Sequence, residues 1–162
     1  MNTIIDIITE EPKWHTNDDI TKSYIEKVAL TVLQCLELPK KLKSLEICVL
    51  LTSNSKMQQL NSNFLGLYKP TNVLSFPSEE LDPTTLLISF KDTKNFYLGD
   101  LAFGYDIIKK ESETNNIELI DHFSHLLIHG ILHLFGFDHQ NEEDYQYMSS
   151  YEDKILSLLQ KP

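Results

Sequence analysis

One stretch of the sequence reads His129-Gly130-Ile131-Leu132-His133-Leu134-Phe135-Gly136-Phe137-Asp138-His139. Residues four apart lie one above the other on an α-helix, so His129 and His133 can bind one metal ion from the same face. Gly136 can take the left-handed conformation that ends a helix, and such a turn brings His139 back toward the metal. Three neutral imidazoles leave one position of a tetrahedral zinc open, which is typical of catalytic sites. The stretch therefore predicts a metal-binding helix in the C-terminal half, with one Zn²⁺ per chain.

The same spacing of histidines occurs in the metzincin proteases, where the residue after the first histidine is the glutamate that acts as general base. Here that residue is Gly130, so the metal ligands are present without the protease's base. Asp138, next to the third ligand, is a candidate either for an outer hydrogen-bond partner of an imidazole or for the base. We favour the outer partner, because a ligand histidine usually needs one.

Two other interpretations of the histidines compete with a catalytic metal. They could be partly buried helix residues that donate to backbone carbonyls, or they could hold a structural metal. Five of the six histidines lie between His122 and His139. Those on the helix share an arc of roughly 80°, which is too polar for a core face unless it binds something. Structural sites generally use cysteine, and neither Cys35 nor Cys48 lies near the cluster.

The chain is strongly acidic, with a formal net charge of −10, and all fourteen basic residues are lysine. This composition by itself disfavours a nucleic-acid partner. Between Glu46 and Glu79 there is no acidic residue, whereas Lys56 and Lys69 are present. A polyanion could approach this segment with the help of a metal ion, although uncharged elements without a partner explain it equally well.

Nothing in the sequence predicts export or insertion into a membrane. The N-terminal residues include Asp6, Glu10 and Glu11 and have no basic region of the kind found in signal peptides. No apolar run approaches the roughly 18 residues that a transmembrane helix needs. Because two cysteines make no disulfide framework, we expect the protein in the cytoplasm.

Hydrophobic periodicity predicts a single α+β domain over residues 1–162, with one mixed sheet of about four strands packed with about five helices. Strands are predicted at 3–8, 45–52, 72–76 and 97–103, and helices at 20–38, 55–64, 106–111, 116–136 and 142–159. Residues 86–90 could form a further strand between turns. Ser55 is expected to cap the second helix, Gly99 to mark a bulge or a close approach to a ligand, and Trp14 to pack at the rim.

Three separate stretches together resemble the YbeY family of bacterial metal-dependent endoribonucleases, also described as ribosomal RNA maturation factors. Residues 125–139 match the family's H-x-x-x-H-G-x-L-H-L-x-G-x-D-H signature at every defined position. Residues 69–77 are similar to the family's K-P-T-D-V-L-S-F-P, with Asn72 in place of aspartate. Leu98-Gly99-Asp100-Leu101 is like the family's L-G-D-I. With chain length and element order, the resemblance covers essentially the whole protein.

The resemblance implies a zinc ion on His129, His133 and His139, in a cleft that cuts single-stranded RNA during small-subunit (16S) ribosomal RNA maturation and ribosome quality control. It also implies ribosomal RNA precursors, ribosomal proteins and a ribosome-associated GTPase as partners. Beyond the ligands, we name three candidates for a part in the chemistry: Asp138, Lys69 and His125. His125 is one helical turn before His129 and is expected to line the cleft.

One position departs from the family pattern N-x-x-F/Y-R-G-K-D-K-P-T. The arginine expected there is Leu65 in this chain, and leucine cannot bind a phosphate through paired hydrogen bonds. Lys69 could partly substitute, as a point charge without the planar fork of arginine. Two other functions therefore stay open. One is a ribosome-assembly factor that binds RNA with little cutting, and the other, on the ligand spacing alone, is a metalloprotease-like zinc hydrolase.

Overall fold

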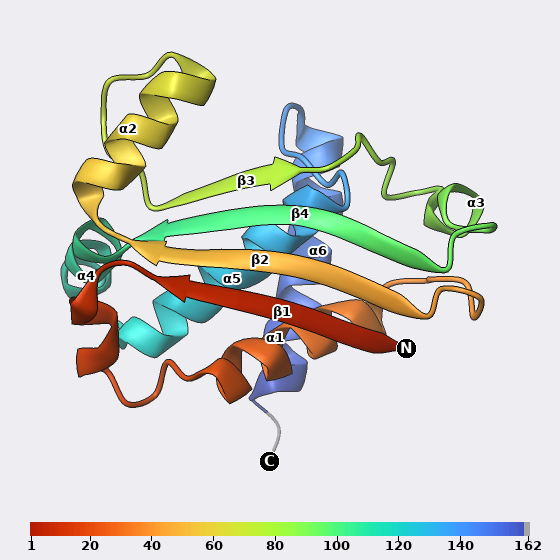
Figure 1. Ribbon diagram of the computed structural model, residues 1–162, viewed down its shortest axis with the longest axis horizontal. Helices are drawn as coiled ribbons and strands as arrows, with labels where there is room; N and C mark the ends of the chain where they lie inside the picture. The colour runs from red at the N-terminus through yellow and green to blue at the C-terminus, as the bar shows by residue number, and fades with distance from the viewer. Residues whose placement is uncertain (161–162) are drawn as a thin grey trace.

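The computed structural model describes residues 1–160, and its centre is a mixed four-stranded sheet (Figure 1). The strands are β1 (Asn2–Thr9), β2 (Ser44–Thr52), β3 (Val73–Pro77) and β4 (Asn95–Gly104). Their order across the sheet is β1-β2-β4-β3, with β1, β2 and β4 parallel and β3 antiparallel to β4. The predicted α+β class with one mixed sheet is confirmed, and all four predicted strands are present.

Six α-helices and a 3-10 helix, η1 (Pro12–Thr16), occur in the described part of the chain. The α-helices are α1 (Lys22–Cys35), α2 (Asn54–Leu65), α3 (Leu86–Ser89), α4 (Tyr105–Thr114), α5 (Leu119–Leu134) and α6 (Glu142–Leu159). Helices α1, α5 and α6 lie behind the sheet in Figure 1, whereas α2 stands at the edge formed by β3. Helix α5 contacts β3, β4, α1, α4 and α6, so it is the central helix of the core.

Strand β2 shows how the sequence separates the two faces of the sheet. Leu45, Ile47 and Val49 are buried, and the residues between them are partly exposed. This period of two places the buried set against the helices, because successive side chains of a strand point to opposite faces.

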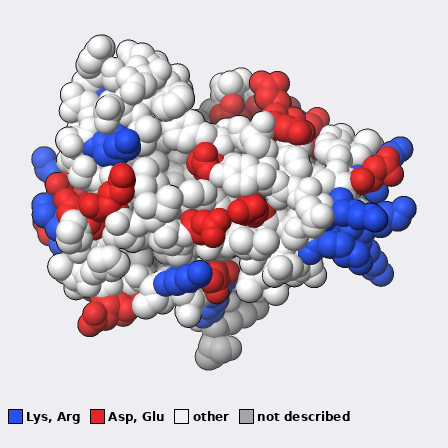
Figure 2. Space-filling view, in the orientation of Figure 1, with Lys and Arg blue, Asp and Glu red and all other residues white. Residues whose placement is uncertain are grey.

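The opposite face of the sheet is largely free of helices and carries acidic groups. Asp6 and Asp100 both lie opposite Cys48 in the register of β1, β2 and β4, and Glu46 lies two residues before Cys48 on the same side. Figure 2 shows acidic side chains across the centre of this face. The hydrophobic effect therefore assigns the helices to one side of the sheet and leaves the other side polar at its centre.

Helix α5 is apolar around most of its circumference. Ten of its sixteen residues are buried, so the polar positions that remain must either face a cleft or find partners. His125, His129 and His133 occupy such positions, one turn apart on one side of the helix. The fold thus holds the predicted metal-binding face on the central helix of the core.

The segment 86–90 forms the short helix α3 and not a strand. Leu86 and Phe90 are buried, whereas Ile88 between them is 70% exposed. Burial at positions four apart follows the helical repeat, and a strand would have buried Ile88 together with its neighbours. The prediction of a strand was therefore wrong, because an apolar run this short does not reveal its period.

Trp14 is also placed differently from the prediction. It is 1% exposed, and its indole N–H donates to the carbonyl of Thr52 at 3.0 Å. Its ring packs edge-on against Tyr105 and Phe123. Trp14 is therefore a core residue whose polar atom is satisfied by the end of β2, and not a residue of the rim.

Several helix boundaries differ because local hydrogen bonds decide them. Ser53, not Ser55, caps α2 by accepting from the backbone N–H of Lys56 at 3.3 Å. Helix α5 begins at Leu119 and not at 116, because Asn116 has a φ of 53° and cannot continue a right-handed helix. Helix α1 ends at Cys35, earlier than the predicted residue 38.

Gly99 marks a bulge, as predicted. Tyr97 of β4 lies opposite Glu46 and Gly99 lies opposite Ile47, so β4 has one extra residue there. The φ of Gly99 is 150°, and a Cβ would meet the carbonyl oxygen of Phe76 at 2.4 Å. The close approach of Gly99 is thus to strand β3.

No helix within residues 1–160 is long and apolar enough to cross a membrane.

Candidate metal centre

The three predicted ligands lie together at one end of α5. His129 and His133 project from the last turns of the helix, and His139 comes from the loop between α5 and α6. One nitrogen from each imidazole lies within 4.8 Å of the others. The ring centroids of His139 and His133 are 5.3 Å apart, and those of His139 and His129 are 5.6 Å apart. The structure therefore brings together the histidines that the spacing selected.

The turn at Gly136 brings His139 back toward the helix. Gly136 has a φ of 96°, which favours glycine, and its N–H donates to the carbonyl of His133 at 3.0 Å. The N–H of Phe137 reaches back to the carbonyl of Leu132 at 3.1 Å, and the Phe137 ring is buried. Hydrogen bonds of this kind satisfy the last carbonyls of a helix. The predicted role of Gly136 is confirmed.

Two hydrogen bonds set which ring nitrogen of each helix histidine is free. The Nδ1 of His133 lies 2.8 Å from the carbonyl oxygen of Phe137, so it must carry the proton. The Nδ1 of His129 lies 3.0 Å from a carboxylate oxygen of Glu152. An ionised carboxylate can only accept a hydrogen bond, so this Nδ1 carries the proton as well. Both rings therefore turn their Nε2 atoms toward each other, at 2.9 Å. Two unprotonated nitrogens aimed at one point fit a metal ion of the zinc type.

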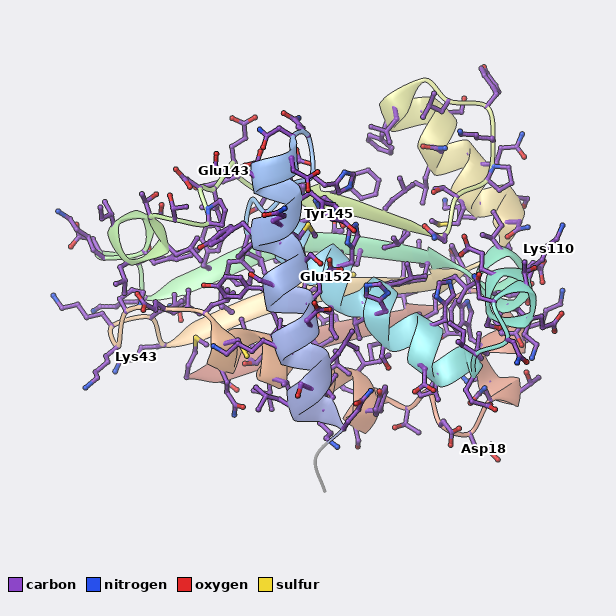
Figure 3. The ribbon with its side chains drawn as sticks, turned by 180° about the vertical axis from the view of Figure 1, so that it is seen from behind. Asp18, Lys43, Lys110, Glu143, Tyr145 and Glu152 are labelled. Carbon is purple, nitrogen blue, oxygen red and sulfur yellow. The ribbon has the colours of Figure 1, made fainter. Side chains whose placement is uncertain are left out.

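Glu152 of α6 is a residue of the site that sequence reasoning missed. Figure 3 shows it on the side of α6 that faces α5. One of its carboxylate oxygens contacts both His129 at 3.0 Å and His125 at 3.1 Å. Burial opposes ionisation of Glu152, but the two histidines outweigh it and lower its pKa to about 2. A signal was present, because Glu152 is an acid on the stripe of α6 that also carries the buried Met148 and Ile155.

Charge around the ligands favours the forms that bind a metal. Burial, followed by the nearby His129, lowers the pKa of His133, so its imidazole is neutral at pH 7. The hydrogen bond to Glu152 raises the pKa of His125, which is the more exposed of the two rings that contact this carboxylate. A ligand imidazole must be deprotonated at the binding nitrogen, so a lowered pKa at His133 helps metal binding.

The three histidines open into a cleft of about 760 Å³ between α5, β3 and the segment that follows β3. Its lining includes Leu65, Asn72, Ser75, Glu79, Glu80, Leu81 and Asp138. Ser75 donates to the carbonyl of Gly130 at 3.2 Å, so it joins β3 to α5. Asn72 donates to a carboxylate oxygen of Glu111 at 3.0 Å and accepts from the N–H of Val73 at 2.7 Å. Both side chains therefore hold the wall of the cleft in place.

The other three predicted site residues are not equally placed. Asp138 lines the cleft, but its carboxylate accepts from the backbone N–H of His139 at 2.8 Å and not from an imidazole. Glu152 takes the part of outer partner that we had expected of Asp138. His125 contacts Glu152 and does not line the cleft. Lys69 is exposed on the loop after α2, outside the cleft lining.

Gly130 lies where α5 packs against the sheet. A Cβ at this position would meet Leu101 at 3.0 Å, Val73 at 3.4 Å and Ser75 at 3.5 Å. A larger side chain there would disturb the contact between α5 and the sheet. The chain thus has no carboxylate at the position of the protease's general base.

We expect Glu152→Gln to weaken zinc binding by roughly 10- to 100-fold, the usual cost of losing an outer partner of a ligand histidine. Glutamine keeps the size and one acceptor oxygen but removes the negative charge beside His129. The measurement is zinc affinity by competition with a chromophoric chelator. Glu143→Gln is the matched control, because Glu143 is exposed on the same helix and carries the same charge. Equal affinities for the two variants would show that Glu152 does not support the site.

Comparison with known proteins agrees with these features. The family model described as "Endoribonuclease YbeY" matches residues 10–160. A protein named Endoribonuclease YbeY from Wolbachia pipientis subsp. Culex pipiens (strain wPip) is 33% identical over 157 residues, which cover 97% of this chain and 95% of that protein. The solution structure of TM1509 from Thermotoga maritima covers 96% of this chain and 91% of its own, with a TM-score of 0.55 and 22% identity, and so supports the fold. The chain therefore belongs to the YbeY endoribonuclease family.

Proposed function

We propose that this protein is a zinc-dependent, single-strand-specific endoribonuclease that acts in 16S ribosomal RNA maturation and ribosome quality control in the cytoplasm. Its proposed partners are ribosomal RNA precursors, ribosomal proteins and a ribosome-associated GTPase. The observation that carries the proposal is the convergence of His129, His133 and His139 in an open cleft. The Wolbachia relative, which is named as an endoribonuclease, is similar over 97% of this chain.

The proposed chemistry divides between the metal and the chain. Bound by the three imidazoles, zinc would supply Lewis acidity to activate water or polarise a phosphoryl oxygen. Glu152 and the carbonyl of Phe137 hold His129 and His133 with Nε2 free for the metal. Asp138 lines the cleft beside His139 and is not engaged with an imidazole, so its carboxylate is our candidate for accepting a proton.

The test is cleavage of a single-stranded RNA by protein loaded with zinc, beside the same protein treated with EDTA. We expect cleavage with zinc, loss of cleavage with EDTA, and recovery when zinc is returned. A fully paired RNA of the same sequence should be cut far more slowly. Cleavage that survives EDTA, or that favours the duplex, would contradict the proposal. EDTA-sensitive hydrolysis of peptides without RNA cleavage would favour a zinc protease instead.

One observation supports a second candidate, an assembly factor that binds ribosomal RNA without cutting it appreciably. Leu65 lines the cleft at the end of α2, at the position where the family pattern has arginine. No lysine of the described residues lines the cleft either. The transition state of phosphodiester cleavage carries additional negative charge, and a cleft without a cationic side chain stabilises that charge only through its metal. RNA binding without cleavage by the zinc-loaded protein would favour this candidate.

We expect Leu65→Arg to raise kcat/KM for RNA cleavage by about tenfold or more, because one well-placed donor to a developing charge commonly contributes at least that factor. The side chain of Leu65 is 58% exposed, so an arginine fits without disturbing the core. Leu67→Arg is the matched control, since Leu67 is exposed in the next loop but does not line the cleft. Equal rates for both variants would show that the missing arginine does not limit the reaction.

A further inference from the structure

Five lysines gather at the end of the molecule where β2 and β4 begin. We call them the lysine cluster: Lys40, Lys41, Lys43, Lys91 and Lys94. They come from two loops, one between α1 and β2 and the other between α3 and β4. Figure 2 shows the largest blue area of this face at that end. A chain with a net charge of −10 thus places more than a third of its fourteen lysines in one small region.

Backbone hydrogen bonds hold the two loops side by side. The N–H groups of Lys43 and Ser44 donate to the carbonyl of Lys94 at 2.7 and 3.1 Å. The hydroxyl of Ser44 donates to Asn95 at 2.7 Å. Leu42 and Phe90 are buried and anchor one loop each. The cluster is therefore assembled by the main chain and does not depend on chance positions of flexible side chains.

The charges of the cluster are not neutralised within the molecule. None of its lysines forms an ion pair with another residue of the range 1–160, although Lys13, Lys22 and Lys109 do. The acidic residues of the two loops are Glu37 and Asp92. Five lysines held this close repel one another, and a polyanion relieves that repulsion when it binds.

A chain of hollows leads from the metal cleft toward the lysine cluster. The cleft shares Leu81 and Asp138 with a second hollow of about 300 Å³. That hollow shares Pro83 and Tyr147 with a third, of about 370 Å³. The third is lined by Glu37 and Ile88, each three residues before a lysine of the cluster. The third hollow therefore ends at the loop that carries Lys40, Lys41 and Lys43, and a flexible strand that follows the hollows from the cleft reaches this loop.

The groove and its end differ in charge. Asp82, Asp144 and Glu37 line the hollows and disfavour phosphates there. Tyr147 lines both outer hollows, and its ring stacks on Phe137 at 5.3 Å and meets Tyr151 edge-on. Among the described side chains along the hollows, only those of the lysine cluster can therefore neutralise RNA phosphates.

We propose that the lysine cluster binds the phosphate backbone of single-stranded RNA at a distance from the cleavage point, so that a long RNA is held at both the metal cleft and the cluster. This inference rests on the proposed function, because it takes RNA as the occupant of the cleft. The cluster raises affinity for long RNA through counterion release, which is independent of base sequence.

The test compares two variants that remove five charges each. In the first, all lysines of the cluster become glutamine. In the second, the changes are Lys13→Gln, Lys22→Gln, Lys27→Gln, Lys109→Gln and Lys110→Gln, all at exposed positions elsewhere. Binding of single-stranded RNAs of about 5 and about 20 nucleotides to the zinc-loaded protein is measured at several salt concentrations, on a time scale shorter than that of cleavage. Circular dichroism and thermal midpoints verify that both variants are folded.

We expect the cluster variant to bind the long RNA at least tenfold more weakly than the control variant, with a salt slope smaller by up to about 3.5. Binding of the short RNA should be the same in both. Equal binding of the long RNA by the two variants would overturn the inference even if zinc-dependent cleavage is intact. Loss of long-RNA binding in the cluster variant alone would support it even if the wild-type protein does not cleave.

Because Leu87 and Ile88 are exposed beside the cluster, binding to phosphatidylserine vesicles is measured as well. Cluster-dependent binding to vesicles with unchanged RNA binding would overturn the inference in favour of a membrane surface.

Discussion

His133→Ala should abolish both zinc binding and RNA cleavage. His133 supplies an imidazole whose Nε2 lies 2.9 Å from that of His129, and its Nδ1 is held by the carbonyl of Phe137. Alanine removes the ligand and leaves two histidines, which do not make a three-ligand catalytic site. We expect zinc affinity to fall by more than the roughly 10- to 100-fold typical of losing an outer partner. Metal content per chain by mass spectrometry and the rate of RNA cleavage measure the two effects.

The matched control for His133→Ala is His15→Ala, since His15 is exposed on η1 and outside the histidine cluster. Thermal midpoints in EDTA show whether the loss of the hydrogen bond to Phe137 affects the fold of the metal-free protein. We expect His15→Ala to keep one zinc and full activity. Equal cleavage by His133→Ala and the wild-type protein would mean that a contaminating nuclease cuts the RNA, or that the reaction does not need this site.

Gly136→Ala should destabilise the protein strongly and loosen the metal site. A Cβ at Gly136 would lie 1.9 Å from the carbonyl oxygen and 2.7 Å from the carbonyl carbon of Leu81. These atoms belong to the backbone, so the clash cannot be relieved by turning a side chain. A φ of 96° adds strain, because residues with a Cβ rarely adopt it. Together these effects should cost about 3 kcal/mol or more.

A loss of that size lowers the thermal midpoint of a chain of this length by roughly 10 °C. Differential scanning calorimetry and urea titration measure it, and zinc affinity should fall as well because Gly136 places His139. Gly66→Ala is the control that separates strain from clash. Gly66 has a φ of 70°, and nothing lies within 4 Å of a Cβ added there, so we expect a cost of about 1 to 2 kcal/mol. If the Gly136→Ala protein were no less stable than the Gly66→Ala protein, the predicted clash with the Leu81 backbone would be wrong.

Local patterns predicted most of the secondary structure and the three ligands. The strands from 45–52 and 97–103 and the histidine helix depend on periodicity and on Gly136, all of which are local. Predictions failed where the decisive contact is distant in sequence. Trp14 is buried because it meets Tyr105 and Phe123, and residues 86–90 form a helix because Leu86 and Phe90 reach the core. Neither contact is visible from the neighbouring residues.

The candidate site likewise has one part that local sequence predicts and another that depends on packing between distant elements. The helical repeat and one left-handed glycine bring His129, His133 and His139 to one point, because all three lie within eleven consecutive residues. The family resemblance rests on this stretch and on two others, and the match over residues 10–160 agrees with it. Sequence alone therefore determined the candidate ligands and the family of this protein.

Only the tertiary structure decided what surrounds the ligands. Glu152 supports His129 because α6 folds back along α5 across 23 residues of chain. Lys69 lies outside the cleft because of the loop after α2, and the lysine cluster forms because β2 and β4 start side by side in a parallel sheet. The physical reason is that backbone geometry sets the distance between residues a few positions apart, whereas packing of whole elements sets it between residues far apart.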